Sequence, residues 1–150
     1  MSEFMKILDE AAGKAGFNLT PQQLEQFDTY YRMLVETNKV MNLTALTEPQ
    51  DVAVKHFVDS VMAYDTYFPG KVLADVGTGA GFPGIPLKIF CPSLKVVLID
   101  SLAKRLNFLQ NVIEALQLQN IECVHLRAED AGKNAAHREK YDIVTARAVA

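Results

Sequence analysis

The stretch that decides the expected fold is Asp75-Val76-Gly77-Thr78-Gly79-Ala80-Gly81-Phe82-Pro83-Gly84. An apolar run typical of a strand leads into it at 72–76, and an apolar segment with helical spacing follows at 85–90. Four glycines between residues 77 and 84 allow positive φ angles and a close approach of the backbone to a ligand. A purely structural turn needs only one or two glycines, so we interpret this loop as a binding site.

Strand and helix patterns alternate on both sides of this loop. The expected strands are 72–76, 96–100, 121–126 and 141–145, and the expected helices are 85–90 and 101–116, the second capped by Ser101, with Leu102, Leu106, Leu109, Val112, Ile113 and Leu116 at helical spacing. The alternation predicts an α/β fold with a parallel, doubly wound, Rossmann-like sheet. The last strand pattern runs to the final residue without a turn or a cap, so we expect C-terminal strands to be missing.

The first seventy residues show helical patterns instead. A first helix ends at Gly16, and Thr20 with Gln23 forms the expected capping box of a second, with Pro21 in its first turn. The apolar stripe of that second helix is predicted to be Leu24, Phe27, Tyr31 and Leu34. We therefore expect an N-terminal helical region at 1–70 and a ligand-binding α/β domain, C-terminally truncated, at 71–150.

A third helix is expected to begin at Thr47-Glu48-Pro49-Gln50 and to end at Pro69-Gly70. One face of this helix is predicted to hold Val54, Phe57, Val58, Val61 and Met62. The same segment contains His56, Asp59 and Ser60, the residue types of a hydrolase triad. Their spacing places all three on one helix face, where they cannot line up as nucleophile, base and orienting acid. We expect them on the substrate side of the cleft.

Composition limits the classes of protein to which this chain can belong. The chain has 150 residues, of which 49% are hydrophobic and 22% charged, as in one globular domain. It has no signal sequence, transmembrane run or metal-ligand spacing, so we expect a cytoplasmic protein without a metal site. Residues 1–70 contain 5 Lys/Arg against 10 Asp/Glu, and residues 71–150 contain 10 against 8. Composition alone therefore indicates no nucleic-acid-binding face.

Asp75 discriminates between ligands. Residues 79–84 also match a dinucleotide-binding pattern, but a carboxylate two residues before Gly77 would repel a pyrophosphate. Asp75 suits a cationic ligand, and S-adenosylmethionine has an ammonium and a sulfonium group. The alternative role for Asp75 is that of a loop-capping acid.

Polar residues follow the other expected strands. Asp100, 23 residues after Gly77, can accept both ribose hydroxyl protons, although NAD sites use the same device and Asp100 can equally be a helix N-cap. Glu129 and Asp130 follow the third strand, where an adenine would lie. Arg147 closes the fourth strand at the level of a methyl acceptor, and its alternative role is an ion pair with Asp75 or another acid.

Several segments together resemble a known family, the bacterial small-subunit (16S) ribosomal RNA guanine-N7 methyltransferases, also called glucose-inhibited division protein B. The segments are 42–47, 55–60, 75–84, 100–105, 127–129 and 145–148. The resemblance implies S-adenosylmethionine as cofactor, a guanine of ribosomal RNA as acceptor, and cofactor contacts from Gly77, Phe82, Ala128, Glu129 and Arg147. With the residues inferred above, the expected cofactor-binding set is Asp75, Gly77, Thr78, Gly79, Gly81, Phe82, Asp100, Ala128, Glu129 and Arg147.

Guanine N7 has a free lone pair and no proton, so methylation there needs no general base, and we assign no catalytic residue. We expect a monomer. Two alternatives stay open: a non-catalytic S-adenosylmethionine-binding fragment, and a methyltransferase that acts on another substrate. An NAD-dependent dehydrogenase is disfavoured by Asp75 and by the absence of a clear hydride-transfer acid.

Overall fold

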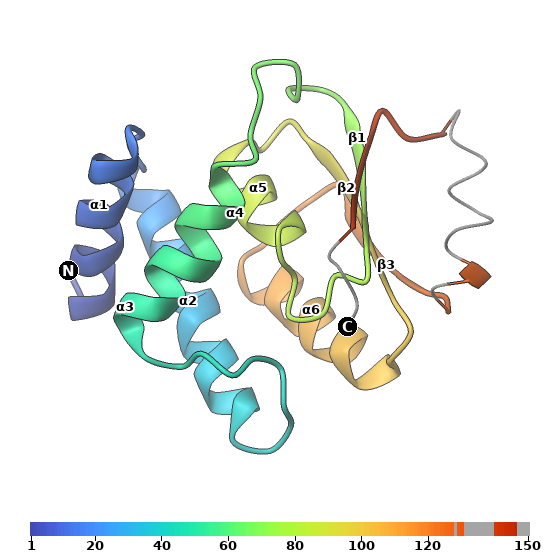
Figure 1. Cartoon of the computed structure of the whole chain (residues 1–150), viewed down its shortest axis with the longest axis horizontal. Helices are drawn as coiled ribbons and strands as arrows, with labels where there is room; N and C mark the ends of the chain where they lie inside the picture. Colours follow the sequence, from blue (N-terminus) through green and yellow to red (C-terminus); the bar gives the residue numbers. More distant parts are fainter. Residues whose placement is uncertain (128, 131–139, 147–150) are drawn as a thin grey trace.

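A computed structural model describes residues 1–127, 129–130 and 140–146 (Figure 1). Four parallel strands form one sheet in the order β3-β2-β1-β4. The strands are β1 (Val72–Val76), β2 (Lys95–Asp100), β3 (Ile121–His125) and β4 (Ile143–Ala146). Along the chain, β2 and then β3 are added on one side of β1, and β4 is added on the other side of β1. This reversal is the strand order expected for a doubly wound sheet, and ligands of such sheets bind at the carboxyl ends of the strands beside the reversal.

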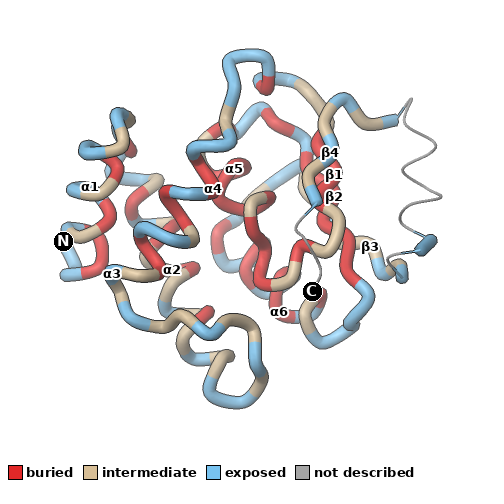
Figure 2. The backbone as a smooth tube through the Cα atoms, in the orientation of Figure 1, coloured by how far each residue is buried: buried red, intermediate tan, exposed pale blue. Residues whose placement is uncertain are grey.

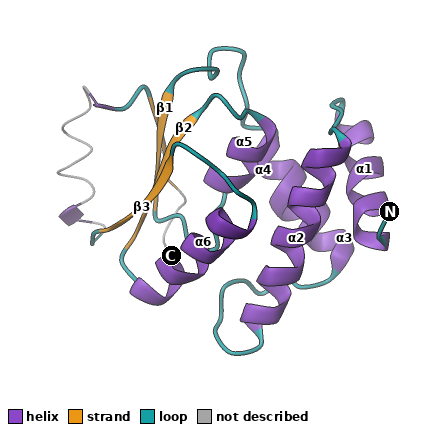
Figure 3. Ribbon diagram, turned by 180° about the vertical axis from the view of Figure 1, so that it is seen from behind, coloured by secondary structure: helices purple, strands orange, loops and turns teal. Residues whose placement is uncertain are grey.

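Helices are layered on one side of the sheet (Figure 3). The helices α5 (Gly84–Phe90) and α6 (Ala103–Ala115) pack on the strands, α2 (Pro21–Asn38) packs on both of them, and α1 (Glu3–Ala15) lies outermost. No helix within the described ranges is long and apolar enough to cross a membrane.

The predicted caps of α1 and α2 are confirmed. Gly16 ends α1 with φ of 93°, a left-handed conformation that glycine adopts without strain. Thr20 Oγ1 accepts a hydrogen bond from the Gln23 backbone N–H at 3.1 Å, and Gln23 Oε1 accepts one from the Thr20 N–H at 2.9 Å. These reciprocal bonds satisfy donors that the first turn of a helix leaves unpaired.

The third helix differs from its prediction. It begins at Pro49 as expected, but it consists of α3 (Pro49–Asp51), the π-helix η1 (Val52–Val58) and α4 (Asp59–Val61), and so ends well before Pro69-Gly70. Val54 is 39% exposed and Met62 is 58% exposed, so the predicted apolar face was wrong at both positions. The wider i→i+5 winding of a π-helix rotates the buried face away from the α-helical pattern, and Val52 and Ala53 are buried instead.

Two further local predictions differ from the structure. In α2 the stripe also includes Tyr30, which is fully buried, whereas the predicted Tyr31 is partly buried and packs against the core. In α6 the N-cap is Leu102, itself exposed, and Ser101 makes no cap. The carboxylate of Asp100 replaces it, because Asp100 Oδ1 accepts the Leu102 N–H at 3.0 Å.

One hydrophobic core joins the N-terminal helices to the α/β layers (Figure 2). Phe27 of α2 and Phe57 of η1 are fully buried and belong to the same cluster as Ile85 of α5 and Leu98 of β2. Burial of each aromatic ring contributes about 2 to 3 kcal/mol to folding. The division at residue 70 stays a prediction, but the two regions share their interior. A smaller apolar cluster, Ala74, Val97 and Ile99, covers the other face of the sheet.

Candidate functional site

The glycine loop, residues 77–83 between β1 and α5, is anchored to the neighbouring strand. The backbone N–H groups of Gly77 and Thr78 both donate to the Ile99 carbonyl oxygen of β2, at 2.9 and 3.0 Å. Gly77, Gly79 and Gly81 have φ angles of 68°, 59° and 105°, a region that other residues adopt only with strain. The alternating glycines thus turn the chain back over the end of the sheet.

Asp75 organises this loop from beneath. Its side chain is fully buried, and Oδ2 accepts hydrogen bonds from Thr78 Oγ1 at 2.8 Å and from the Gly84 N–H at 2.9 Å. Its Oδ1 accepts one from Thr145 Oγ1 of β4 at 3.1 Å. The loop-capping role that the sequence left open is therefore present. Contact of Asp75 with a ligand stays a prediction.

The glycines of the loop serve different purposes. A Cβ on Gly84 would lie 2.5 Å from Leu98 Cδ2 and 2.9 Å from Asp75 Oδ2, so Gly84 lets α5 start directly on the sheet. A Cβ on Gly81 would lie 2.5 Å from Tyr30 Oη. A Cβ on Gly79 would meet no described atom within 4 Å, so the space beside this residue is open. A ligand can therefore approach the loop at Gly79.

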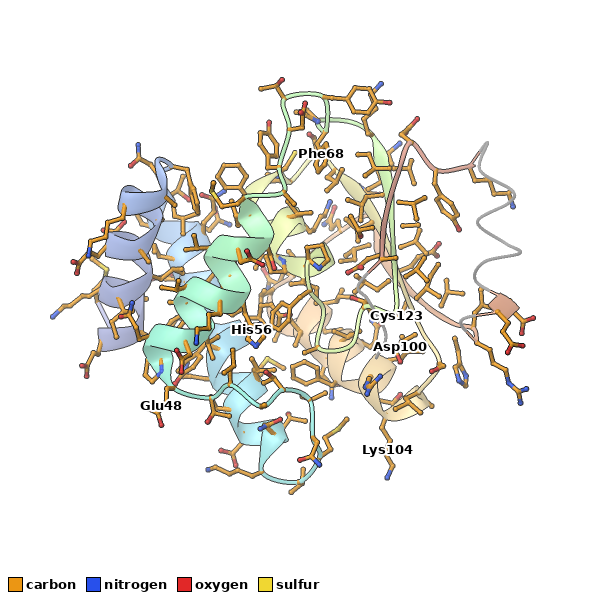
Figure 4. The ribbon with its side chains drawn as sticks, viewed as in Figure 1. Glu48, His56, Phe68, Asp100, Lys104 and Cys123 are labelled. Carbon is orange, nitrogen blue, oxygen red and sulfur yellow. The ribbon has the colours of Figure 1, made fainter. Side chains whose placement is uncertain are left out.

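Asp100, labelled in Figure 4, lies at the carboxyl end of β2 and is hydrogen-bonded to Gly79. Its Oδ2 accepts the Gly79 N–H at 2.8 Å, and Arg105 Nη1 lies 3.4 Å from its Oδ1, which also accepts the Leu102 N–H. A carboxylate offers about four lone-pair sites, and these contacts use three. The Asp100 side chain is 2% exposed, so a ligand reaches it only if a neighbouring group moves.

The segment after β3 begins close to Asp100. The Leu126 N–H donates to the Asp100 carbonyl oxygen at 3.0 Å. Glu129 and Asp130 follow, and both are exposed. The predicted contacts at Ala128 and Arg147 lie outside the described residues.

His56 of η1 reaches the glycine loop, and Figure 4 shows it on the helix beside that loop. Its ring stacks on Phe82 with centroids 4.4 Å apart and an interplanar angle of 15°. Its Nε2 lies 2.7 Å from Thr44 Oγ1, which ties the loop between α2 and α3 to the same place. His56 is thus the one of the three substrate-side candidates that is brought to the loop.

The other two candidates have different surroundings. Asp59 is exposed, whereas Ser60 is buried and its hydroxyl has no hydrogen-bond partner among the described residues. The prediction that His56, Asp59 and Ser60 share one face was wrong for Asp59, because Asp59 and Ser60 are adjacent residues of the helix α4 and adjacent helical residues point in different directions.

The sequence patterns missed Tyr30 and Thr145. Tyr30 Oη donates to the Ala80 carbonyl oxygen at 2.5 Å, and Thr145 binds Asp75 as described. Tyr30 lies three residues after Phe27, at a helical spacing that could have revealed it. Thr145 follows an apolar run, and only its partner 70 residues earlier shows its importance. No group of three or more His, Cys, Asp or Glu side chains in the described part of the chain could hold a metal ion.

The sequence of residues 23–150 matches the model of a known protein family, described as GidB, rRNA small subunit methyltransferase G. The chain belongs to this family. It is 55% identical over 141 residues to the ribosomal RNA small subunit methyltransferase G of Lactobacillus helveticus, covering 91% of this chain and 59% of that protein. It is 51% identical over 152 aligned positions to the protein of the same name from Desulforamulus reducens, covering 100% and 63%.

The chain therefore spans about three fifths of the length of these GidB-family relatives. Among solved structures, a putative protein-L-isoaspartate O-methyltransferase from Plasmodium falciparum, in complex with S-adenosyl-L-homocysteine, has a TM-score of 0.60. The likeness covers 97% of this chain and 73% of that one at 13% identity. It confirms the fold.

Proposed function

We propose that this chain is the S-adenosylmethionine-binding portion of an enzyme that transfers a methyl group to N7 of a guanine in small-subunit ribosomal RNA. The observation that supports this most strongly is its membership of the GidB family, whose match includes the glycine loop and Asp100. We further propose a cytoplasmic protein that acts as a monomer, with its helical region at 1–70 and its cofactor domain at 71–150.

The residues at the end of the sheet fit the cofactor. The open space beside Gly79 gives a ligand access to the loop. The three described contacts of Asp100 leave lone-pair capacity for a ribose hydroxyl. The carboxyl group of Asp75 lies buried under the loop, and an acidic side chain at this place suits a cationic ligand better than a pyrophosphate. Gly77, Thr78, Gly81 and Phe82 would line the same site, with Ala128 and Glu129 beside the adenine.

The proposed mechanism relies on placement. When bound, S-adenosylmethionine supplies an electrophilic methyl group. Guanine N7 needs no deprotonation, so the protein has only to hold N7 in line with that methyl group. We assign the acceptor side to His56, which is fixed by Phe82 and Thr44, and to Arg147. Asp59 and Ser60 belong to the same proposed acceptor side, and no side chain is an obligatory proton carrier.

The experiment that tests the proposal is methyl transfer with mapping of the product. Small ribosomal subunits without N7 methylation, and their free RNA, are incubated with the chain and labelled S-adenosylmethionine. We expect label in 7-methylguanosine after nuclease digestion. RNA transcribed with 7-deazaguanosine, which has a carbon at that position, is the control that must stay unlabelled.

Other outcomes correspond to the alternatives. Cofactor binding without transfer to either RNA would indicate the non-catalytic binding fragment. Label at an atom other than guanine N7, or in protein, would indicate a methyltransferase with another substrate. A sharp loss of rate that follows one side-chain ionisation, with cofactor binding intact, would contradict the mechanism without a general base.

A further inference from the structure

Tyr30 connects the N-terminal helices to the middle of the glycine loop. Its hydroxyl donates to the Ala80 carbonyl oxygen at 2.5 Å, and both residues are buried. The other loop anchors come from β1, β2 and β4, through Asp75, Ile99 and Thr145. Among the described residues, Tyr30 makes the hydrogen bond to the loop from outside the α/β domain, whereas His56 contacts the loop through its ring, which stacks on Phe82.

Gly81 is shaped to receive this hydroxyl. A Cβ on Gly81 would lie 2.5 Å from Tyr30 Oη, so any larger residue there would displace the tyrosine. The Tyr30 ring is held in turn by Phe57, with centroids 5.1 Å apart, and by Phe82, with centroids 5.8 Å apart. The hydroxyl is therefore aimed at the loop by a rigid aromatic cluster that spans α2, η1 and the loop.

We propose that Tyr30 is a positioning residue for cofactor binding, which holds the 80–81 peptide so that Gly79 faces the ligand. This inference rests on the proposed function. The consequence is that the helices of residues 1–70 form part of the cofactor site rather than a detachable lid. Tyr30 acts through the loop backbone and touches no reacting atom.

The physical reason is the burial of the Ala80 carbonyl. Without the tyrosine hydroxyl this oxygen is left without its partner in a place that water does not reach, which costs more than the bond itself contributes. The loop then relieves the cost by rotating the 80–81 peptide. Ligand binding must restore the original conformation, and so the affinity falls.

The test compares Tyr30→Phe with Tyr31→Phe. Each variant keeps its ring and loses one hydroxyl that donates to a backbone carbonyl, because Tyr31 Oη donates to the Thr47 oxygen at 3.1 Å. Only the Tyr30 bond reaches the glycine loop. The two variants therefore match in chemistry and differ in position.

Binding of S-adenosylmethionine is measured by calorimetry, and amide hydrogen exchange by mass spectrometry. We expect Tyr30→Phe to bind roughly three- to tenfold more weakly, the loss of about one neutral hydrogen bond, with faster exchange at residues 78–82. Tyr31→Phe is expected to bind within about twofold of the wild type, a shift below a typical hydrogen-bond contribution, with unchanged exchange there. Melting temperatures of both variants show whether the fold is retained.

Each result has one meaning. Wild-type affinity and unchanged exchange in Tyr30→Phe would overturn the proposal, as would equal losses of affinity in both variants. If the wild type does not bind S-adenosylmethionine, the proposed function fails, and exchange at 78–82 still decides whether Tyr30 positions the loop. If Tyr30→Phe does not fold, Gly81→Ala replaces it. Its Cβ displaces the hydroxyl, so unchanged exchange at 78–80 in that variant would overturn the proposal.

Discussion

Gly84→Ala tests whether the start of α5 is packed as tightly as the structure indicates. The added Cβ would lie 2.5 Å from Leu98 Cδ2, 2.9 Å from Asp75 Oδ2 and 3.3 Å from Asp75 Cβ. Leu98 and Asp75 are both fully buried in the sheet, so neither can move aside without disturbing its neighbours. Overpacking of this kind costs about 1 to 3 kcal/mol, and the shorter contacts place the expected cost at about 2 to 3 kcal/mol.

Thermal and urea unfolding measure this cost. For a chain of this size, about 2 to 3 kcal/mol lowers the melting temperature by roughly 4 to 12 °C. Gly79→Ala is the matched control, because its Cβ meets open space and its φ of 59° alone causes strain. We expect a smaller loss there, about 1 kcal/mol. Equal melting temperatures for Gly84→Ala and the wild type, or a larger loss for Gly79→Ala, would refute the packing argument.

Three further predictions concern residues away from the loop. Gly13 lies inside α1 with nothing within 4 Å of an added Cβ, so Gly13→Ala should stabilise the protein by about 0.5 to 1 kcal/mol; an unchanged or lower melting temperature would contradict this. Burial, and to a smaller extent the charge of Glu122, raise the pKa of the Cys123 thiol. The rate of Cys123 alkylation, mapped by mass spectrometry, should therefore rise at a higher pH in the folded protein than in urea-unfolded protein. Coincident pH profiles in the two states would contradict this. Burial lowers the pKa of Lys88, whose Nζ donates to the Pro92 and Leu94 carbonyl oxygens. At pH values between the lowered and the ordinary lysine pKa, the unfolded chain therefore binds more protons than the folded chain. The free energy of unfolding of the wild type should rise relative to that of Lys88→Met as pH increases through that window. A difference between the two free energies, measured by urea unfolding, that stays constant with pH would contradict this.

The parts of the fold that could be predicted depend on neighbours in the sequence. The capping box at Thr20, the glycine stop of α1 and the four strands follow from local hydrogen bonds and from side-chain periodicity. The prediction of the third helix failed because a π-helix has no distinct pattern in the local sequence. Its winding exposed Val54.

The sequence predicted where the candidate site lies, but it did not predict the hydrogen bonds that hold the residues of this site in place. The sequence identified Asp75, Asp100 and the glycines, because carboxylates at strand ends next to a glycine-rich turn are a recognisable pattern. It could not show that Asp75 is bound by Thr145 of β4, or that Tyr30 of α2 reaches Ala80, since both contacts join residues 50 to 70 positions apart. It also could not show that Asp100 accepts a hydrogen bond from the Gly79 N–H.

The central claim is that the glycine loop, together with Asp75 and Asp100, binds S-adenosylmethionine. Calorimetric titration of the folded chain tests this claim most directly. We predict saturable heat with S-adenosylmethionine and none with NAD. Asp100→Asn should bind roughly tenfold more weakly or worse, since a charged acceptor is worth about 1.5 to 3 kcal/mol. Asp142→Asn, whose side chain binds the Val72 N–H at the opposite end of the sheet, should bind as the wild type does. Saturable binding of NAD, or no heat with S-adenosylmethionine from a chain shown to be folded, would contradict the account.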